Sequence, residues 1–245
     1  MRLAIVADIH GNLAALEAVT ADIRRRGVER AVNLGDSLSG PLLPRETAQY
    51  LMARGWLSLA GNHERQLLSP GPEGRHPSDA YAYAQLTDAE LGWLRALPAT
   101  ACLSPDIFLC HGTPACDSEY FLETVERGRV RPATAAEVES RLGTEAAAVV
   151  ACAHTHLTRL VRSRRGQLLV NPGSVGLPAY DDVVPEPHVV ETGSPDARYA
   201  IVDCVAGGWT VDLISVPYDF EPMARLAARA GRPDWEHALR TGYFT

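Results

Sequence analysis

Five short polar motifs, each directly after an apolar run, contain the side chains that could do chemistry in this chain. Asp, Asn and His side chains can bind divalent metal ions, and two imidazoles separated by one residue can converge on one ion. Each motif alone has an ordinary explanation, such as a turn or a helix cap. Together they hold five of the eight histidines, which favours one shared metal site. The motifs are Asp8-Ile9-His10-Gly11-Asn12, Gly35-Asp36, Gly61-Asn62-His63-Glu64, His111-Gly112 and His154-Thr155-His156.

The apolar runs before these motifs predict the strands that position them. In the first half, Asn12 can cap a helix that stops at Gly27, and a second helix ends at Gly55. The resulting β-α-β-α-β order favours a layered α/β fold with partly parallel strands. The carboxyl ends of such strands are where sites assemble, so the motifs are expected to meet at one edge. The expected strands are residues 3–7, 31–34 and 57–60, and the second helix is 44–54.

The second half is richer in strands. Its pattern predicts two buried strands, two hairpins and a helical tail interrupted near Gly231 and Pro233, while Thr87 opens a further helix. Two aperiodic stretches with Pro and Gly predict loops. Without a clear linker, we expect one domain over residues 1–245, with a helical extension from about residue 219. The strands are 107–110 and 147–151, the hairpins 157–162 with 167–171 and 199–205 with 210–216, and the loops 69–78 and 178–196.

Composition places the chain among ordinary globular proteins. It has 245 residues, of which 46% are hydrophobic and 22% charged, and a formal net charge of -7. This charge disfavours non-specific nucleic-acid binding, but a small phosphorylated substrate is compatible with it because bound metal reverses the local field. No apolar run approaches the roughly 20 residues of a membrane span. The amino-terminal apolar run is too short for a signal peptide, so we expect a cytoplasmic protein whose five cysteines are reduced.

The ordered series of motifs resembles the calcineurin-like metallophosphoesterase superfamily. It looks most like the bacterial branch of small phosphodiesterases and symmetrical diadenosine-tetraphosphatase-like proteins, and Asn171-Pro172-Gly173-Ser174-Val175-Gly176 matches a motif typical of that branch. The resemblance spans roughly residues 1 to 215. It implies an α/β fold, namely a four-layer α-β-β-α sandwich of two mixed sheets, with a site for two metal ions between the strand ends of the two sheets.

Carried over motif by motif, the resemblance assigns the site residues. Asp36 would bridge two divalent ions, and His63 would be a catalytic histidine that binds neither ion but lies over the substrate. The remaining implied ligands are Asp8, His10 and His156 for one ion and Asn62, His111 and His154 for the other.

Two residues depart from the family pattern. Glu64 stands where the family usually has Asp, and it could still orient His63 by accepting a hydrogen bond. Ala153 stands where Gly is usual, and its small side chain leaves the ligand assignment intact. Arg65, which follows the same motif as Glu64, either reaches a substrate phosphate or lies on the surface. The turn at Asn171 is expected to pack beside the site rather than to contact substrate.

The chemistry of such a site follows from its charges. Two divalent ions, two aspartates and a bridging hydroxide leave one net positive charge, which attracts a phosphate oxygen. Paired ions about 3.5–4 Å apart lower the pKa of the water between them and hold the oxygens of an in-line displacement. The imidazole, amide and carboxylate ligands favour Mn, Fe, Zn, Co or Ni over Ca or Mg, and we expect Mn to support activity well in vitro.

The sequence therefore predicts a metal-dependent phosphoesterase that hydrolyses phosphomonoesters or phosphodiesters of small or nucleotide substrates. Two alternatives remain at this stage: a protein serine/threonine phosphatase, and a metal-binding scaffold without turnover. A scaffold should lack ligands or the catalytic histidine, whereas all of the expected residues are present. Substrate choice is expected to depend on the segments 69–78, 112–133 and 178–196. The sequence leaves the oligomeric state open.

Overall fold

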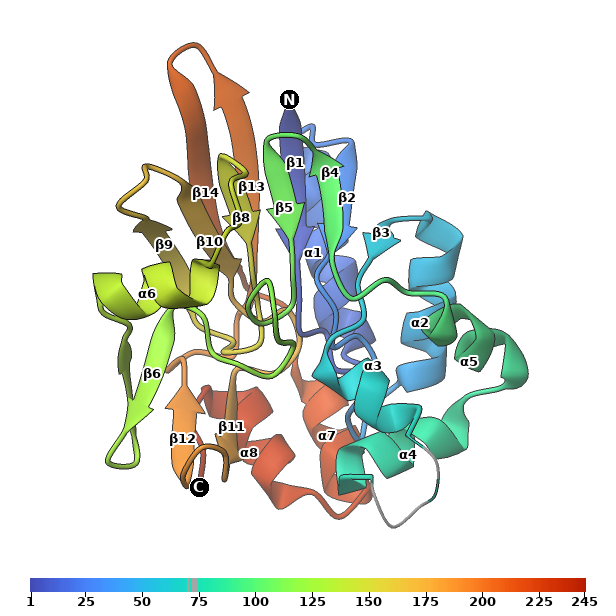
Figure 1. The fold of residues 1–245 in the computed structure, drawn as a ribbon. Coiled ribbons are helices and arrows are strands. Elements are labelled where there is room, and N and C mark those ends of the chain that lie inside the picture. The colour runs from blue at the N-terminus through green and yellow to red at the C-terminus, as the bar shows by residue number, and fades with distance from the viewer. Residues whose placement is uncertain (70, 72–74) are drawn as a thin grey trace.

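A computed structural model gives the structure of residues 1–69, 71 and 75–245. Two five-stranded sheets pack face to face, and helices cover their outer faces (Figure 1). Helix α1 (Leu13–Arg25) packs on the outer face of the first sheet, and α6 (Ala135–Leu142) packs on the outer face of the second. The expected four-layer α-β-β-α sandwich of two mixed sheets is confirmed.

The first sheet contains the predicted β-α-β-α-β unit. Its strands, in spatial order, are β14 (Gly208–Val216), β13 (Ala197–Val205), β1 (Arg2–Val6), β2 (Arg30–Asn33) and β3 (Leu57–Ser58). The strands β1, β2 and β3 are parallel to one another, whereas β13 is antiparallel to β1. Because parallel strands end at the same edge, the polar motifs that follow them are delivered to one side of the sheet.

The second sheet repeats this arrangement. Its strands, in spatial order, are β4 (Ala101–Ser104), β5 (Ile107–Leu109), β8 (Val149–Ala151), β10 (Leu168–Pro172) and β9 (Thr158–Arg162). β8 lies between β5 and β10 and is parallel to both, so the histidine motifs after β5 and β8 emerge together. The predicted hairpins are confirmed as β9 with β10 and β13 with β14.

The remaining helices begin and end at residues with clear local reasons. The Asn12 side chain accepts the backbone N–H of Ala15 at 3.1 Å and caps α1, and Thr87 forms the predicted capping box. Gly55 adopts a left-handed conformation where the second helix ends. The helices are α2 (Pro44–Arg54), α3 (Asn62–Leu67), α4 (Pro77–Gln85), α5 (Asp88–Arg95), α7 (Glu221–Arg229) and α8 (Pro233–Thr241). No described helix is long and apolar enough to cross a membrane.

Alternation along β1 builds two cores at once. Leu3 and Ile5 point toward the second sheet, where they join a buried cluster with residues such as Val149. Ala4 and Val6 point the other way and pack with α1. A strand buried on both faces reads as a continuous apolar run, which is why the sequence predicted it so clearly.

Regular structure occurs in the two segments predicted to be loops and in a third segment that was expected to affect substrate choice. The predicted loop 178–196 contains the hairpin β11 (Ala179–Asp182) and β12 (His188–Glu191), and the segment 112–133 contains β6 (Glu123–Glu126) and β7 (Arg129–Pro132). These strands are four residues long and rich in polar side chains, so periodicity did not reveal them. The loop predicted at 69–78 ends where α4 begins, and its residues 70 and 72–74 lie outside the described part of the chain.

The predicted helical tail is present as α7 and α8. Both helices pack on β11 and on the loop before α2, where Met223, Trp235 and Leu239 share a buried cluster with Leu42 and Ala179. Figure 1 shows this helical pair, at the red end of the colour scale, below the strand ends of the sandwich. The tail therefore lies beside the edge to which the polar motifs are delivered.

Candidate metal centre and its cavity

The structure brings the predicted metal ligands together in two buried groups. Each group offers ligand atoms that lie within 4.8 Å of one another. The asparagine assigned to the second ion joins its group, since the Asn62 Oδ1 atom lies 3.1 Å from the His111 Nε2 atom. The first group is Asp8, His10 and His156, and the second is Asp36, His111 and His154.

The backbone at these ligands is strained. Only six described residues other than glycine have a positive φ, and five of them are predicted metal ligands. An L-residue in the left-handed region costs about 1–2 kcal/mol. Such strain persists where the surrounding structure fixes it, and it clusters at functional sites. The five are Asp8, His10, Asp36, His154 and His156, with φ between 52° and 71°.

His10 and His156 face each other with unprotonated nitrogens. Each ring donates its Nδ1 proton to a backbone carbonyl, His10 to Ser39 at 2.8 Å and His156 to Leu177 at 2.7 Å. Burial lowers the pKa of His10 to about 4 and that of His156 well below its usual value. Both rings are therefore neutral, and their Nε2 lone pairs are 3.2 Å apart. A cation bound by both nitrogens removes this conflict, so the first group fits a metal ion.

The second group has the same excess of acceptors. The His111 ring donates Nδ1–H to the Leu34 carbonyl at 2.9 Å, which leaves Nε2 facing Asn62 Oδ1 and Asp36 Oδ2, each at 3.1 Å. Burial lowers the pKa of His111, but Asp36 outweighs it and raises the pKa to about 10. The His111 Nε2 atom therefore holds a proton between itself and these oxygens when no metal is bound. A bound metal ion can take the place of that proton. Burial also lowers the pKa of His154, to about 3.

Asp8 makes the need for a cation clearest. Both of its carboxylate oxygens are buried, and neither has a hydrogen-bond partner among the described residues. Burial raises the pKa of Asp8 well above its usual value. A carboxylate without hydrogen bonds in a protein interior is costly unless it takes up a proton or binds a cation. The carboxylate and the surrounding imidazoles together fit a divalent metal ion.

The turn after β10 packs against the candidate metal centre. The Ser174 hydroxyl donates to the Asp8 carbonyl at 2.8 Å and accepts the Leu177 N–H at 2.8 Å, and it is Leu177 whose carbonyl holds His156. Asn171 donates to the Ala153 carbonyl just before the His-Thr-His motif. A Cβ at Gly176 would lie 1.8 Å from the Ile9 carbonyl oxygen. This turn therefore packs against the predicted metal ligands, as expected.

Glu64 makes no hydrogen bond to His63 among the described residues, although the sequence suggested that it could orient this ring. The Glu64 carboxylate accepts three backbone N–H groups, from Asp36 at 2.8 Å, Ser37 at 2.7 Å and Gly61 at 2.8 Å. It lies at the start of α3, where a carboxylate three residues into the helix satisfies otherwise free N–H groups. Glu64 thus fixes the loops that carry the ligands, and its hydrogen bonds turn it away from the histidine beside it in sequence.

Asp79 is the carboxylate that holds His63. Its Oδ1 atom lies 2.8 Å from His63 Nδ1, and its side chain is fully buried. Burial lowers the pKa of His63, but the carboxylates of Asp36 and Asp79 raise it to about 9. Asp79 lies in the first turn of α4, where the helix dipole favours a negative charge. No local pattern indicates this pair, because its members are sixteen positions apart in the sequence.

Arg65 does not line the cavity over the metal centre. Its guanidinium makes two hydrogen bonds to Asp117, at 2.7 and 2.8 Å, and its side chain is 55% exposed. The arginine that does line the cavity is Arg232 from the C-terminal tail. Of the two interpretations left open for Arg65, this geometry favours the surface role.

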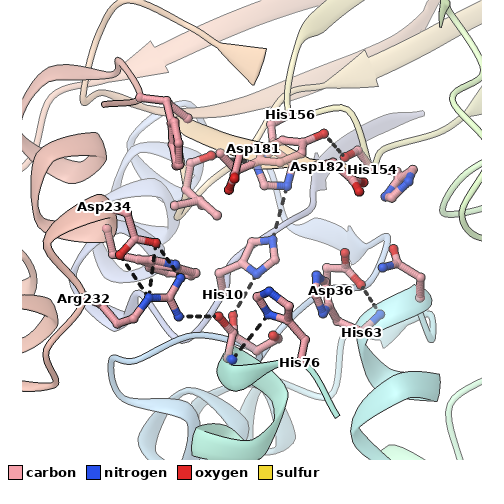
Figure 2. A pocket seen from close by; sticks show the side chains of 18 of the residues that line it. His10, Asp36, His63, His76, His154, His156, Asp181, Asp182, Arg232 and Asp234 are labelled. Carbon is pink, nitrogen blue, oxygen red and sulfur yellow. Dashed lines mark hydrogen bonds and ion pairs between the residues drawn. The ribbon is translucent and has the colours of Figure 1, made fainter. Parts of the chain in front are cut away.

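The cavity has a volume of about 340 Å³ and two unlike sides. We call the predicted ligands and the histidine beside them its floor. We call the residues from α4, β11 and α8 that face them its wall. Figure 2 shows His10 facing His156 in the middle of the cavity, with His63 beside Asp36 on one side and Arg232 paired with Asp234 on the other. The floor lining is His10, Asp36, Asn62, His63, His154 and His156, and the wall lining includes Ser78, Tyr180, Asp181, Asp182, Arg232, Asp234 and Trp235.

A buried network of two tyrosines and a histidine packs against the His-Thr-His motif. The Tyr120 hydroxyl lies 2.7 Å from the Tyr180 hydroxyl and 2.9 Å from His188 Nε2. The Tyr120 ring packs edge-on to His154, and the Tyr180 ring packs against His156. His188 is buried, although it lies in the segment 178–196 that was predicted to be a loop. The residues that clamp these two ligands thus come from segments that sequence reasoning treated as loops.

Comparison with known proteins identifies the family. Residues 1–203 match the family model described as the calcineurin-like phosphoesterase superfamily domain. The protein MJ0912 of Methanocaldococcus jannaschii, itself uncharacterised, is 38% identical over 66 residues, which is 27% of this chain and 27% of that protein. The chain thus matches about a quarter of the length of this curated relative.

Solved structures share the fold. A metallophosphoesterase from Sphaerobacter thermophilus has a TM-score of 0.74 at 24% identity, with 98% of both chains covered. The protein PH1004 from Pyrococcus horikoshii OT3 has a TM-score of 0.77 at 19% identity, with 100% of this chain and 99% of that chain covered. A candidate diadenosine tetraphosphatase has a TM-score of 0.53 at 18% identity, with 88% and 94% covered. At these identities the likeness is one of fold.

Proposed function

The chain belongs to the calcineurin-like phosphoesterase superfamily, and we propose that it is a metal-dependent phosphoesterase acting on small phosphomonoesters or phosphodiesters, nucleotides among them. One observation carries this proposal. Buried imidazole lone pairs and carboxylate oxygens converge at the cavity floor with too few protons to satisfy them. Divalent cations are the ligands that such a donor set binds.

We propose that two ions bind at the floor. The carboxylate, amide and imidazole donors suit Mn, Fe, Zn, Co or Ni. When bound, such ions act as Lewis acids toward a phosphate and lower the pKa of water. Asp36 lies with the second group and is proposed to contact both ions. The ligands to the first ion would be Asp8, His10 and His156, and those to the second Asn62, His111 and His154.

His63 is the proposed proton donor to the leaving oxygen. Its ring lines the cavity. Its Nδ1 atom is hydrogen-bonded to Asp79, which leaves Nε2 as the nitrogen available to substrate. The ring lies beside the ligand His10 with a centroid distance of 5.4 Å. A positioned general acid contributes about 10²–10⁴-fold to the rate. The presence of this residue, together with a complete ligand set, supports turnover over a scaffold role.

The size and charge of the cavity favour a small substrate. A volume of about 340 Å³ is at the low end of the range for small-molecule sites. A phosphorylated side chain on a folded protein would have to pass α8 and β11 to reach the floor. The wall has carboxylates at Asp181, Asp182 and Asp234 against one guanidinium at Arg232, so it repels further phosphate groups. These features support a phosphoester with one phosphate and an uncharged organic group.

Metal removal tests the proposed function. The protein as purified is stripped with a chelator, and hydrolysis of p-nitrophenyl phosphate, its phenyl diester, nucleoside cyclic phosphates, a dinucleoside polyphosphate and a phosphopeptide is measured after adding back single metals. We expect activity to disappear on stripping and to return best with Mn, Co or Ni, and small esters to be preferred to the phosphopeptide. Full activity in the stripped protein would refute the proposal, and a preference for the phosphopeptide would favour the protein phosphatase instead.

A further inference from the structure

The family match ends at residue 203, yet part of the cavity wall lies beyond it. Arg232, Asp234 and Trp235 line the cavity from α8 and the residue before it. The Trp235 ring packs edge-on to the ligand His10, with ring centroids 6.0 Å apart. The C-terminal tail therefore forms part of the site.

Arg232 is held rigidly at the wall. Its guanidinium forms a forked pair with Asp234, at 2.6 Å from Nη2 and 3.0 Å from Nε, and it lies over the Trp235 ring. Its Nη1 atom donates to the Ser78 hydroxyl at 2.9 Å, across 154 residues of sequence. Figure 2 shows Arg232 paired with Asp234 along one side of the cavity. The Asp234 carboxylate neutralises the Arg232 guanidinium, so Arg232 is poorly suited to attract an anion. Its remaining role is to make a hydrogen bond of fixed direction to Ser78.

The contact at Ser78 is one residue away from the partner of His63. Ser78 and Asp79 directly follow Pro77 in the first turn of α4. Ser78 is buried, and its carbonyl also accepts the Gly40 N–H at 3.3 Å. A shift of this turn moves the Asp79 carboxylate and with it the ring of His63. Arg75 also ties this segment to α3, because it donates to the Leu67 carbonyl at 2.8 Å.

We propose that Arg232 is a positioning residue that acts through Ser78 and Asp79 on His63, so that the C-terminal helical pair sets the orientation of the catalytic histidine. This inference rests on the role proposed above for His63. It differs from a substrate contact, because it predicts an effect on the histidine when only the Arg232–Ser78 hydrogen bond is broken. It also differs from general stabilisation, because an equivalent ion pair elsewhere in the tail should have no such effect.

The chain offers a matched control for general stabilisation. Arg240 joins the two tail helices through Glu221, at 3.0 Å from both Nε and Nη2, and it also pairs with Glu236. It does not line the cavity. Arg240→Ala therefore removes partly exposed ion pairs from the tail helices, as Arg232→Ala does, but leaves the contact with α4 intact.

The first test observes the histidine directly. In zinc-loaded protein with ¹⁵N-labelled histidine, the proton of His63 Nδ1 that bonds to Asp79 is followed by NMR and assigned with His63→Ala. We expect Arg232→Ala and Ser78→Ala to shift and broaden this signal, and Arg240→Ala to leave it unchanged. An unaltered His63 signal in both Arg232→Ala and Ser78→Ala would overturn the proposal, whatever the rates show.

The second test uses leaving groups. Rates for a phenyl ester and a p-nitrophenyl ester of the same phosphate are measured for each variant, with melting curves to confirm folding. Arg232→Ala and Ser78→Ala should lower kcat for the phenyl ester by about five- to tenfold and for the nitrophenyl ester by less than about twofold. On an Asp79→Asn background, Arg232→Ala should add nothing to the ratio of the two rates.

The outcomes separate the two proposals. Equal losses with both esters, or an effect of Arg232→Ala without one of Ser78→Ala, would make Arg232 a substrate contact and overturn the positioning role. An unchanged ratio in His63→Ala would instead remove the proposed acid function of His63, and the NMR signal would still decide whether Arg232 positions it.

Discussion

The floor and the wall of the cavity are built in opposite ways. The floor side chains follow the ends of parallel strands within a few residues, and most of these ligands have a strained left-handed backbone. The wall side chains come from α4, β11 and α8, and distant hydrogen bonds such as Arg232 to Ser78 hold them in place. The floor is thus fixed by local chain geometry and the wall by tertiary contacts.

This difference separates chemistry from selectivity. A proposed ligand such as His10 cannot move without changing both its strained turn and its hydrogen bond to the Ser39 carbonyl. Wall residues such as Asp181 are on the surface side of a short hairpin, where substitution costs little stability. We therefore expect changes at the floor to remove activity and changes at the wall to alter which leaving group or substrate is used.

The largest effect is expected at the centre of the floor. Asp36→Asn should lower occupancy of both metal sites and reduce kcat by more than about a thousandfold, because Lewis-acid stabilisation of the phosphate is worth several kcal/mol. Metal content per chain and kcat are measured together, with Asp203→Asn at the surface as the control. Two tightly bound ions per chain in Asp36→Asn would reject the bridging assignment.

His63 marks the boundary between floor and wall. His63→Ala should keep both metals and the fold, while the rate with a poor leaving group falls by about 10²–10⁴-fold. The loss should be smaller with nitrophenolate, which barely needs a proton. Melting temperature, metal content and both rates are measured on one preparation. If His63 were only a structural residue at the start of α3, stability would fall and turnover per folded molecule would stay the same.

The wall contact to His63 should have a smaller effect. Asp79→Asn removes the carboxylate that orients the ring, and we expect a loss of about 10- to 100-fold with a phenyl ester, since small misplacements of catalytic groups have effects of that order. Metal content should not change. Asp88→Asn, an exposed carboxylate in the first turn of α5, is the matched control. Loss of metal in Asp79→Asn would mean that the wall also shapes the floor.

The smallest effect on catalysis is expected far from the cavity, at Asp22. The hydrogen bonds of this carboxylate depend on pH and should affect only the stability of the fold. Burial raises the pKa of Asp22, but hydrogen bonds from Tyr199 at 2.7 Å, Arg26 at 2.7 Å and Arg25 lower it below its usual value overall. A depressed folded-state pKa stabilises the protein above the unfolded value of about 3.9, and this contribution is lost as pH falls through the folded value.

Asp22→Asn should therefore lower the free energy of unfolding by about 1–3 kcal/mol at pH 7. The difference from the unsubstituted protein should shrink as pH falls below about 4. Denaturant unfolding at several pH values measures this. The ratio of phenyl to nitrophenyl rates should stay unchanged, and a changed ratio would show that the cavity responds to loosening anywhere in the fold.

The sequence by itself determined the floor. Apolar runs predicted the central strands, and the side chains that follow them, from Asp8 to His156, had to meet once those strands were parallel. The layered α/β order follows from such short-range patterns, because a strand and the turn after it are contiguous in sequence. The resemblance of the motifs to the family implied the four-layer sandwich and the ligand assignment, and the ligand assignment stays a prediction. Short-range order was misleading at Glu64. Its place next to His63 in the sequence suggested a contact between the two side chains, but at the start of α3 the Glu64 carboxylate accepts backbone N–H groups instead.

Only the tertiary structure decided the wall. Nothing in the spacing of His63 and Asp79, or of Arg232 and Ser78, marks them as partners, because the contacts depend on how α4 and α8 pack. The short hairpin of β11 and β12 was likewise hidden, since four polar-rich residues per strand carry too little periodicity. Contacts between side chains far apart in sequence depend on the packing of whole elements, which local residue patterns do not encode.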